Sequence, residues 1–179
     1  FEGPEEALKQ TANTQPGLYL CGVAGAALLR ERGLRPDVVA GHSLGEFTSL
    51  VCAGALPFED AVPLVHKRGI FMQQAVPVGE GAMAAVMGID EKNVAKLVQE
   101  ASQSQILVMA NYNSSKQIVI SGDSQAIDRA VALGDQYGAV VHKLKVSAPF
   151  HSPLMEPAAE QLDREIAKLS FADPEVPVI

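Results

Sequence analysis

The sequence has little of several features that would narrow its class at once. Its 179 residues include two cysteines, Cys21 and Cys52, and 14 Lys and Arg residues against 21 Asp and Glu residues. Two cysteines are too few for a disulfide framework and fit a reducing compartment. The net charge of −7 argues against general nucleic-acid binding, which needs a basic face. The sequence shows no apolar run long enough to span a membrane, no signal peptide, no fixed repeat and no low-complexity stretch.

What the chain does contain is typical of a globular domain. Apolar residues make up 47% of it and charged residues 20%, enough to form a buried core. The chain opens at Phe1 and ends in an apolar stretch, 176–179, that is typical of the start of a strand. We therefore expect it to be an internal piece of a longer protein. Any site that needs residues from the missing ends would then be incomplete in these 179 residues.

The first third of the chain has the pattern of a layered α/β fold. Its order is helix, strand, sharp turn and helix, which indicates helices packed on a sheet. The predicted elements are a buried helix over 18–32 that ends at Gly33, a short buried strand over 37–40, a turn over 41–45, and helices over 46–55 and 58–74.

The middle of the chain changes to the order β-α-β-β-α-β, the split arrangement of a ferredoxin-like unit. We expect 82–147 to form a ferredoxin-like subdomain inserted into a hydrolase-like parallel-sheet core, which is made of 1–81 and 148–179. The predicted elements are strands over 82–87, 106–110, 117–121 and 139–146, and helices over 91–102 and 124–137, with a polar turn over 113–116.

The turn Gly41-His42-Ser43-Leu44-Gly45 matches the nucleophile-elbow pattern, in which a strand ends, one residue takes a strained turn and a helix begins. Both glycines lack a Cβ and would leave room for the turn. Ser43 would present its hydroxyl at the helix N-terminus, and the Leu44 N–H would point at a tetrahedral oxyanion. The plainer alternative is a turn whose serine only caps the helix.

A serine nucleophile needs a base, and the chain has four histidines. His151 is the preferred base, because it lies in a loop where the chain returns from the small subdomain; the alternative is a solvated loop histidine. His42 should point away from Ser43, while His66 and His142 fit a helix and a strand. The acidic residues that we considered as a third member, Asp123, Asp128, Asp135 and Glu156, all fit exposed positions better.

Arg68 lies on the predicted helix 58–74 among apolar residues. A guanidinium beside the serine would clamp a substrate carboxylate through two hydrogen bonds. On the residues alone, we favour a surface arginine paired with Glu59 or Asp60.

These motifs run in one order along essentially the whole chain, and together they resemble malonyl-CoA:acyl carrier protein transacylases. The serine turn, the arginine about one helix later and the histidine after the predicted insert carry the likeness. The matching segments are 41–47 (GHSLGEF), 53–56 (AGAL), 59–61 (EDA), 67–69 (KRG) with 72–73 (MQ), 111–114 (NYNS), 117–122 (QIVISG) and 149–155 (PFHSPLM).

The resemblance implies a ping-pong transfer of malonyl from coenzyme A to the phosphopantetheine thiol of acyl carrier protein, for fatty acid biosynthesis. Ser43 would carry the malonyl ester, His151 would act as general base and acid, and Arg68 would hold the free carboxylate. The Leu44 amide would donate to the oxyanion. The pocket would be lined by His42, Met72 and Asn113.

The resemblance also sets expectations about partners and completeness. We expect no bound cofactor or metal, no nucleic-acid or membrane partner, a monomer, and a cytoplasmic location, or a plastid or mitochondrial one if a transit peptide precedes the chain. Basic residues Lys67, Lys143 and Lys145 are candidates for meeting the acidic carrier protein. The family's glutamine segment and its histidine-orienting carbonyl fall outside these residues, and the turn 113–117 departs from the family pattern. We therefore expect the 179 residues alone to be nearly inactive.

Three other functions stay open on the sequence. An acyltransferase domain of a polyketide or other multienzyme synthase would use the same chemistry. An α/β serine hydrolase, such as an esterase, would share the elbow but gives no role to Arg68 or to the inserted subdomain. A carrier-protein docking module without catalysis would not need Ser43, Arg68 and His151.

Overall fold

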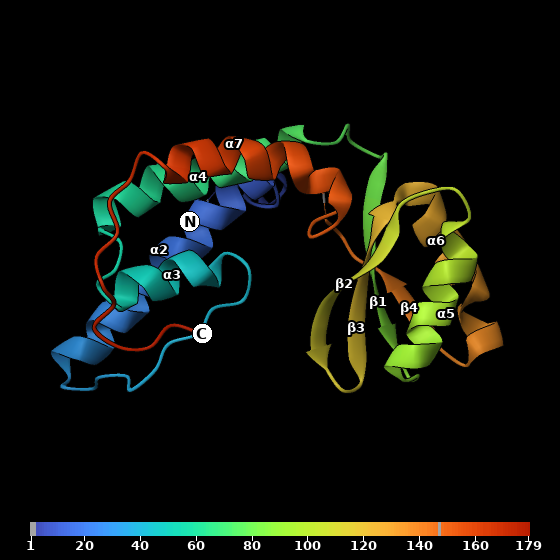
Figure 1. The fold of residues 1–179 in the computed structure, drawn as a ribbon, viewed down its shortest axis with the longest axis horizontal. Coiled ribbons are helices and arrows are strands. Elements are labelled where there is room, and N and C mark those ends of the chain that lie inside the picture. The colour runs from blue at the N-terminus through green and yellow to red at the C-terminus, as the bar shows by residue number, and fades with distance from the viewer. Residues whose placement is uncertain (1–2, 147) are drawn as a thin grey trace. The chain divides into compact units, whose positions relative to one another are not determined.

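The structure is a computed structural model that describes residues 3–146 and 148–179. It is a mixed α/β protein with a small antiparallel sheet (Figure 1). Its contacts form two compact units, Phe1–Phe71 with Glu160–Ile179, and Met72–Ala159. The subdomain predicted over 82–147 lies inside the second unit, and its last residue, Ser147, lies outside the described residues.

The first unit is helical and has its own apolar core. That core includes Tyr19, Leu56 and Val65, and part of α7 packs on it through Leu162 and Ile166. The helices of this unit are α1 (Glu5–Leu8), α2 (Thr11–Glu31), α3 (Gly45–Cys52), the part of α4 (Phe58–Gln74) up to Phe71 and the part of α7 (Glu156–Ile166) from Glu160. The α4 helix has the predicted bounds, whereas α1 and α7 were not predicted.

The α2 helix begins seven residues earlier than predicted, at Thr11, although Pro16 lies inside it. Proline lacks an N–H and normally breaks a helix, because the carbonyl four residues earlier loses its donor. Here that carbonyl, of Ala12, lies 3.0 Å from Nδ1 of His66 on α4. A carbonyl oxygen only accepts, so Nδ1 carries the hydrogen. A side chain from another helix thus supplies the donor that Pro16 lacks.

The prediction that this helix is buried is wrong for much of its surface. Tyr19 is fully buried, its ring stacks on Phe58 at 5.8 Å and burial raises the pKa of its hydroxyl to about 12. Leu18, Leu28 and Leu29 are instead exposed. The helix is apolar on most sides, but the core residues of this unit cover only the side that carries Tyr19 and Val23.

The buried strand predicted over 37–40 is also not formed. Among the described residues it is reduced to a single parallel bridge between Val39 and Val178, and Val38 is 47% exposed. A buried strand needs hydrogen-bonded neighbours along its length, and here one residue pairs, through Val39 N–H to Pro177 and Ile179 N–H to Val39. The described residues therefore do not form the parallel sheet that we predicted.

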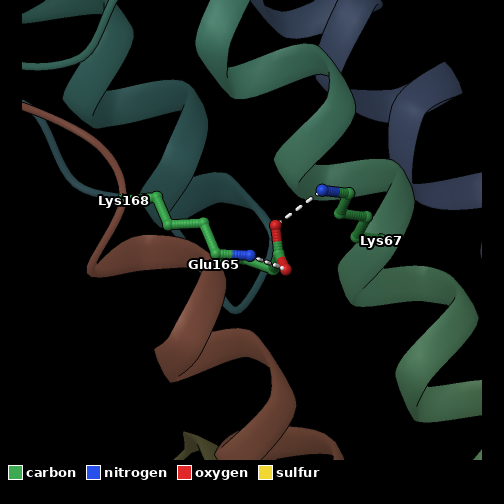
Figure 2. A network of polar contacts seen from close by, with 3 residues as sticks. All are labelled: Lys67, Glu165 and Lys168. Carbon is green, nitrogen blue, oxygen red and sulfur yellow. Dashed lines mark hydrogen bonds and ion pairs between the residues drawn. The ribbon is translucent and has the colours of Figure 1, made fainter.

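An ion-pair network joins α7 to α4 in the first unit. Glu165 accepts from Lys67 of α4 and from Lys168, each at 2.6 Å. Figure 2 shows the three side chains together. The hydrogen bonds from Lys168 and Lys67 lower the pKa of the Glu165 carboxyl. Lys67, one of the lysines considered for carrier-protein docking, is thus engaged within the chain.

The second unit contains the four-stranded sheet, in the order β2-β3-β1-β4. All three strand pairs are antiparallel, and Ala84 on β1 lies opposite Ile120 on β3 and Lys143 on β4. The elements are β1 (Gly81–Met87), α5 (Glu91–Ser102), β2 (Leu107–Ser114), β3 (Gln117–Asp123), α6 (Ser124–Leu133), the 3-10 turn η1 (Gly134–Tyr137), β4 (Val140–Lys143) and the 3-10 turn η2 (Pro153–Met155).

The two faces of this sheet carry different contacts, because side chains alternate along each strand. Helices α5 and α6 cover one face (Figure 1), where Ala84 and Val86 pack with Leu97 and Ile127 in a fully buried core. The opposite face carries the smaller cluster Met83, Ala85 and Val119, against which Phe150 and Leu144 pack.

The predicted elements of this unit are present, and all but α5 have shifted ends. The helix predicted over 124–137 changes to a 3-10 turn at Gly134, and the chain then reverses at Gly138 in a left-handed conformation. The strand predicted over 139–146 keeps only Val140–Lys143. None of the helices within the described residues is long and apolar enough to cross a membrane.

Candidate active site

The turn that carries Ser43 has the strained geometry of a nucleophile elbow. Ser43 has a φ of 54°, a left-handed conformation that residues other than glycine rarely adopt. Helix α3 begins two residues later, and the Gly45 N–H donates to the His42 carbonyl at 2.9 Å. A Cβ on Gly41 would collide with the backbone of Gly45 and Glu46. Glycine at position 41 is therefore required for the chain to reverse so tightly.

The expectation that Gly45 also leaves room for the turn is wrong. A Cβ on Gly45 would meet open space within the described part of the chain. Between the two glycines, the side chain of Leu44 is buried in the core of the first unit. Its N–H lies at the N-cap of α3, where amides have no acceptor inside the helix.

Arg68 reaches this turn from α4. Its Nη2 donates to Ser43 Oγ at 3.1 Å, and its Nη1 donates to Gln15 Oε1 at 2.6 Å. The guanidinium carbon lies 5.7 Å from the centre of the Phe47 ring, a cation–π contact. The guanidinium is thus held by the Phe47 ring against its planar face and by hydrogen bonds from both terminal nitrogens.

The surroundings of Arg68 differ from the surface position that the residues alone favoured. Among the described residues, Arg68 donates hydrogen bonds to Ser43 and Gln15, and not to Glu59 or Asp60 as the surface position would require. Burial lowers the pKa of the guanidinium, and the nearby Glu46 opposes this effect. An arginine stays charged at neutral pH even so. The site therefore holds a partly buried positive charge beside the serine hydroxyl.

Two residues of this site were missed by the sequence analysis. Gln15 and Thr11 are 6% and 7% exposed, and Gln15 Nε2 donates to Thr11 Oγ1 at 3.1 Å. The predicted helix began at residue 18, so both residues fell outside any predicted element. The sequence feature that could have pointed to these two residues is that they are polar and lie just before an apolar helix.

His151 also has a strained backbone, with a φ of 58°. Its neighbours hold the loop from both sides: Ser152 Oγ donates to the Pro149 carbonyl at 2.7 Å, and Phe150 packs on the sheet. A Cβ on Gly81 would collide with the Pro149 ring, so β1 also lies directly against the loop. The side chain of His151 is exposed. The loop is thus fixed in a form suited to present one side chain.

The other predicted residues occupy various positions. His42 is exposed in the serine turn, and Met72 is buried on α4. Asn113 is exposed near the end of β2 and donates to Gln117 Oε1 at 3.0 Å. The structure brings Ser43, Leu44 and Arg68 together within the first unit; by their contacts Met72, Asn113 and His151 belong to the second.

Two further expectations were that Lys143 helps to dock the carrier protein and that the protein binds no metal. Lys143, like Lys67, is engaged in an ion pair, with Asp128 at 2.6 Å. Within residues 3–146 and 148–179, no three or more His, Cys, Asp or Glu side chains are grouped as a metal site would need.

The family model described as acyl transferase domain matches residues 1–179. The chain belongs to the acyl transferase domain family.

Among its relatives is the malonyl CoA-acyl carrier protein transacylase of Escherichia coli K12, which is 47% identical over 180 residues. That alignment covers 99% of this chain and 58% of the relative, so the chain spans somewhat more than half of the length of that protein. The family resemblance predicted from the motifs is thereby confirmed.

Solved structures support the same assignment. The malonyl CoA-acyl carrier protein transacylase of Coxiella burnetii matches with a TM-score of 0.97 at 50% identity, over 99% of this chain and 57% of that one. A malonyl-transacylase in complex with a type II polyketide synthase acyl carrier protein matches with a TM-score of 0.96 at 42% identity, over 99% of this chain and 58% of that one.

Proposed function

We propose that the protein containing these residues transfers a malonyl group from coenzyme A to the phosphopantetheine thiol of acyl carrier protein, for fatty acid biosynthesis. The observation that carries this proposal is the positively charged Arg68 with Nη2 3.1 Å from the hydroxyl of Ser43, a serine in a strained turn. The names of the relatives supply the reaction class, and this arrangement supplies residues that suit it.

The proposed chemistry proceeds in two half-reactions. Ser43 Oγ attacks the thioester carbonyl of malonyl-CoA, while His151 removes the hydroxyl proton; the C–S bond breaks and the coenzyme A thiolate takes that proton. The phosphopantetheine thiol then attacks the malonyl ester, with His151 as base, and the serine hydroxyl is restored. The Leu44 N–H stabilises the oxyanion in both steps, because the start of α3 presents partial positive charge there.

Arg68 gives this site its preference for malonyl. A guanidinium holds a carboxylate through two parallel hydrogen bonds. Malonyl has a free carboxylate that can accept them, and acetyl has none. An acetyl group would leave the partly buried charge without its partner, and such a charge is unfavourable. Around the acyl group, His42, Met72 and Asn113 are proposed to line the pocket.

The finer fold assignment belongs to the same proposal. We infer a hydrolase-like core over 1–81 and 148–179, and a ferredoxin-like subdomain over 82–147. The order β-α-β-β-α-β and the antiparallel strand order β2-β3-β1-β4 support the second, and the turn at Ser43 leading into α3 supports the first. The proposal also includes the partners, which are a coenzyme A thioester and acyl carrier protein. It further includes a protein without a resident cofactor that is monomeric and cytoplasmic.

One alternative has a specific observation in its favour. The solved complex of a similar malonyl-transacylase holds an acyl carrier protein of a type II polyketide synthase. The same chemistry here would then feed polyketide rather than fatty acid synthesis. Rates measured with the two kinds of carrier protein from the source organism would separate these functions. An esterase is less well supported, since it gives no role to Arg68.

The test uses the natural full-length protein that contains these residues, malonyl-CoA, acetyl-CoA and holo acyl carrier protein. Intact-mass spectrometry should detect a malonyl adduct that Ser43→Ala abolishes and that carrier protein removes. Release of free malonate without transfer would contradict the proposal and favour a hydrolase.

The arginine is tested by Arg68→Ala. We expect malonyl transfer to fall about 10–100-fold, because hydrogen bonds to a charged group contribute about 1.5–3 kcal/mol, while the relative use of acetyl-CoA rises. Arg164→Ala is the matched control, because among the described residues Arg164 is found in one ion pair, an exposed one with Glu160 at 3.8 Å. An unchanged preference for malonyl in Arg68→Ala would contradict the carboxylate clamp.

A further inference from the structure

Gln15 is a buried polar residue of this site to which the proposed reaction assigns no role. It accepts from Arg68 Nη1 at 2.6 Å and donates to Thr11 Oγ1 at 3.1 Å. Chemistry sets the direction of this chain of hydrogen bonds. A guanidinium only donates, so Gln15 turns its Oε1 to Arg68, and its Nε2 then faces the hydroxyl oxygen of Thr11. Thr11 thus holds Gln15 in the orientation that Arg68 requires.

The turn of α2 that carries these residues is fixed against α4 by independent contacts. A Cβ on Gly69, the residue after Arg68, would lie 2.6 Å from the Thr11 carbonyl oxygen, so the two backbones meet at this glycine. One turn away, His66 donates to the Ala12 carbonyl at 3.0 Å. The start of α2 therefore lies at a set distance from the turn of α4 that bears the arginine.

We propose that Gln15, held by Thr11, is a positioning residue that orients Arg68 and thereby sets the preference of the site for an acyl group with a free carboxylate. This inference rests on the proposed function. Phe47 lies under the guanidinium, while Ser43 and Gln15 each engage one terminal nitrogen. The other N–H groups of the guanidinium then have fixed directions and are ready to hold a carboxylate.

The neutrality of the Gln15 amide is part of this role. An amide orients the guanidinium without neutralising it, so the positive charge stays available for the substrate. A glutamate at this position would place a carboxylate where Gln15 Oε1 lies, 2.6 Å from Nη1. That internal ion pair would compete with the malonyl carboxylate for Arg68 and weaken its binding. Acetyl has no carboxylate, so its binding would not be weakened in this way.

The experiment measures kcat/KM for acylation of Ser43 by malonyl-CoA and by acetyl-CoA, in the natural full-length protein. For Gln15→Glu we expect the malonyl-to-acetyl ratio to fall about 100-fold, because the substrate loses a charge-assisted pair. For Gln15→Met, which has similar length and no hydrogen bond, we expect a fall of about tenfold, mainly through the KM for malonyl-CoA. Gln10→Glu makes the same change at an exposed position next to α2 and should leave the ratio unchanged.

A wild-type protein without a preference for malonyl would overturn the proposed function itself. If the wild type prefers malonyl, an unchanged ratio in both Gln15 variants would overturn the inference alone. An equal loss with both substrates would also overturn it, because it would show a structural role only. Thermal midpoints accompany the rates, and if Gln15→Glu does not fold, Gln15→Met, which buries no charge, decides the question.

Discussion

At the scale of single residues, the serine turn depends on two glycines that are not equivalent. A Cβ on Gly41 would collide with the backbone of the first turn of α3, whereas one on Gly45 would meet open space among the described residues. Ser43 between them already has a strained φ of 54°, so the turn depends on its neighbours to persist. The pattern alone treats the two glycines alike, and only the packing distinguishes them.

This difference predicts opposite results for two matched substitutions. Gly41→Ala should destabilise the protein by about 3 kcal/mol or more, because backbone atoms cannot move aside as a flexible side chain would. Gly45→Ala should change stability by less than about 1 kcal/mol, and a gain is expected because alanine favours a helix more than glycine does. Chemical denaturation of both variants measures this, and equal losses would contradict the steric account.

At the scale of elements, contacts between helices hold the first unit together beyond its apolar core. Glu165 of α7 binds Lys67 of α4 and Lys168, and its pKa is lowered by both lysines. A carboxyl with a lowered folded-state pKa contributes stability at a pH above its unfolded value of about 4.3, and that contribution is lost as the pH falls through the folded pKa.

We therefore expect Glu165→Gln to lower the thermal midpoint slightly at pH 7, and the difference from the wild type to vanish in acid. Thermal unfolding from pH 7 down to about pH 3 tests this, across the unfolded pKa of about 4.3. Glu160→Gln on the same helix is the control, because the one ion pair of Glu160 within the described part of the chain is with the exposed Arg164, at 3.8 Å. A difference that persisted unchanged at low pH would show that the ionised carboxylate is not the cause.

At the scale of the whole molecule, two apolar cores that share no residue define two units. Leu97 in the second core is fully buried, and Leu64 in the first is 3% exposed. Burial of a leucine of this kind contributes several kcal/mol, and separate cores allow local unfolding of one unit at a time.

Leu97→Ala should therefore reduce the protection of amides in α5, β1 and β3 from hydrogen exchange, by about 2–5 kcal/mol. The protection of α2 and α3 should change little in this variant. Leu64→Ala should give the reverse pattern. Equal losses of protection in both units, whichever leucine is removed, would show that they unfold together.

Much of the second unit could be predicted from the sequence, because its elements have strong periods and clear ends. The bounds of α5 agree with the prediction, and the strands β1 and β3 differ by one or two residues at an end. The bounds of α4, most of which lies in the first unit, agree as well. The ends of β4 and α6 could not be predicted, since they depend on which residues find partners. The same is true of the start of α2, where a histidine from α4 compensates for Pro16.

The sequence by itself determined the family, the serine turn and the residues proposed for catalysis, because these depend on residue types in a fixed order. Only the tertiary structure decided the environment of Arg68, since α2 and α4 must pack before Gln15 and Ser43 can bind it. The structure also showed that residues 37–40 form a single bridge to Val178 rather than a strand, and that Gly69 lets α2 and α4 meet. Local patterns specify which groups are present, and distances between segments far apart in the chain determine what those groups contact.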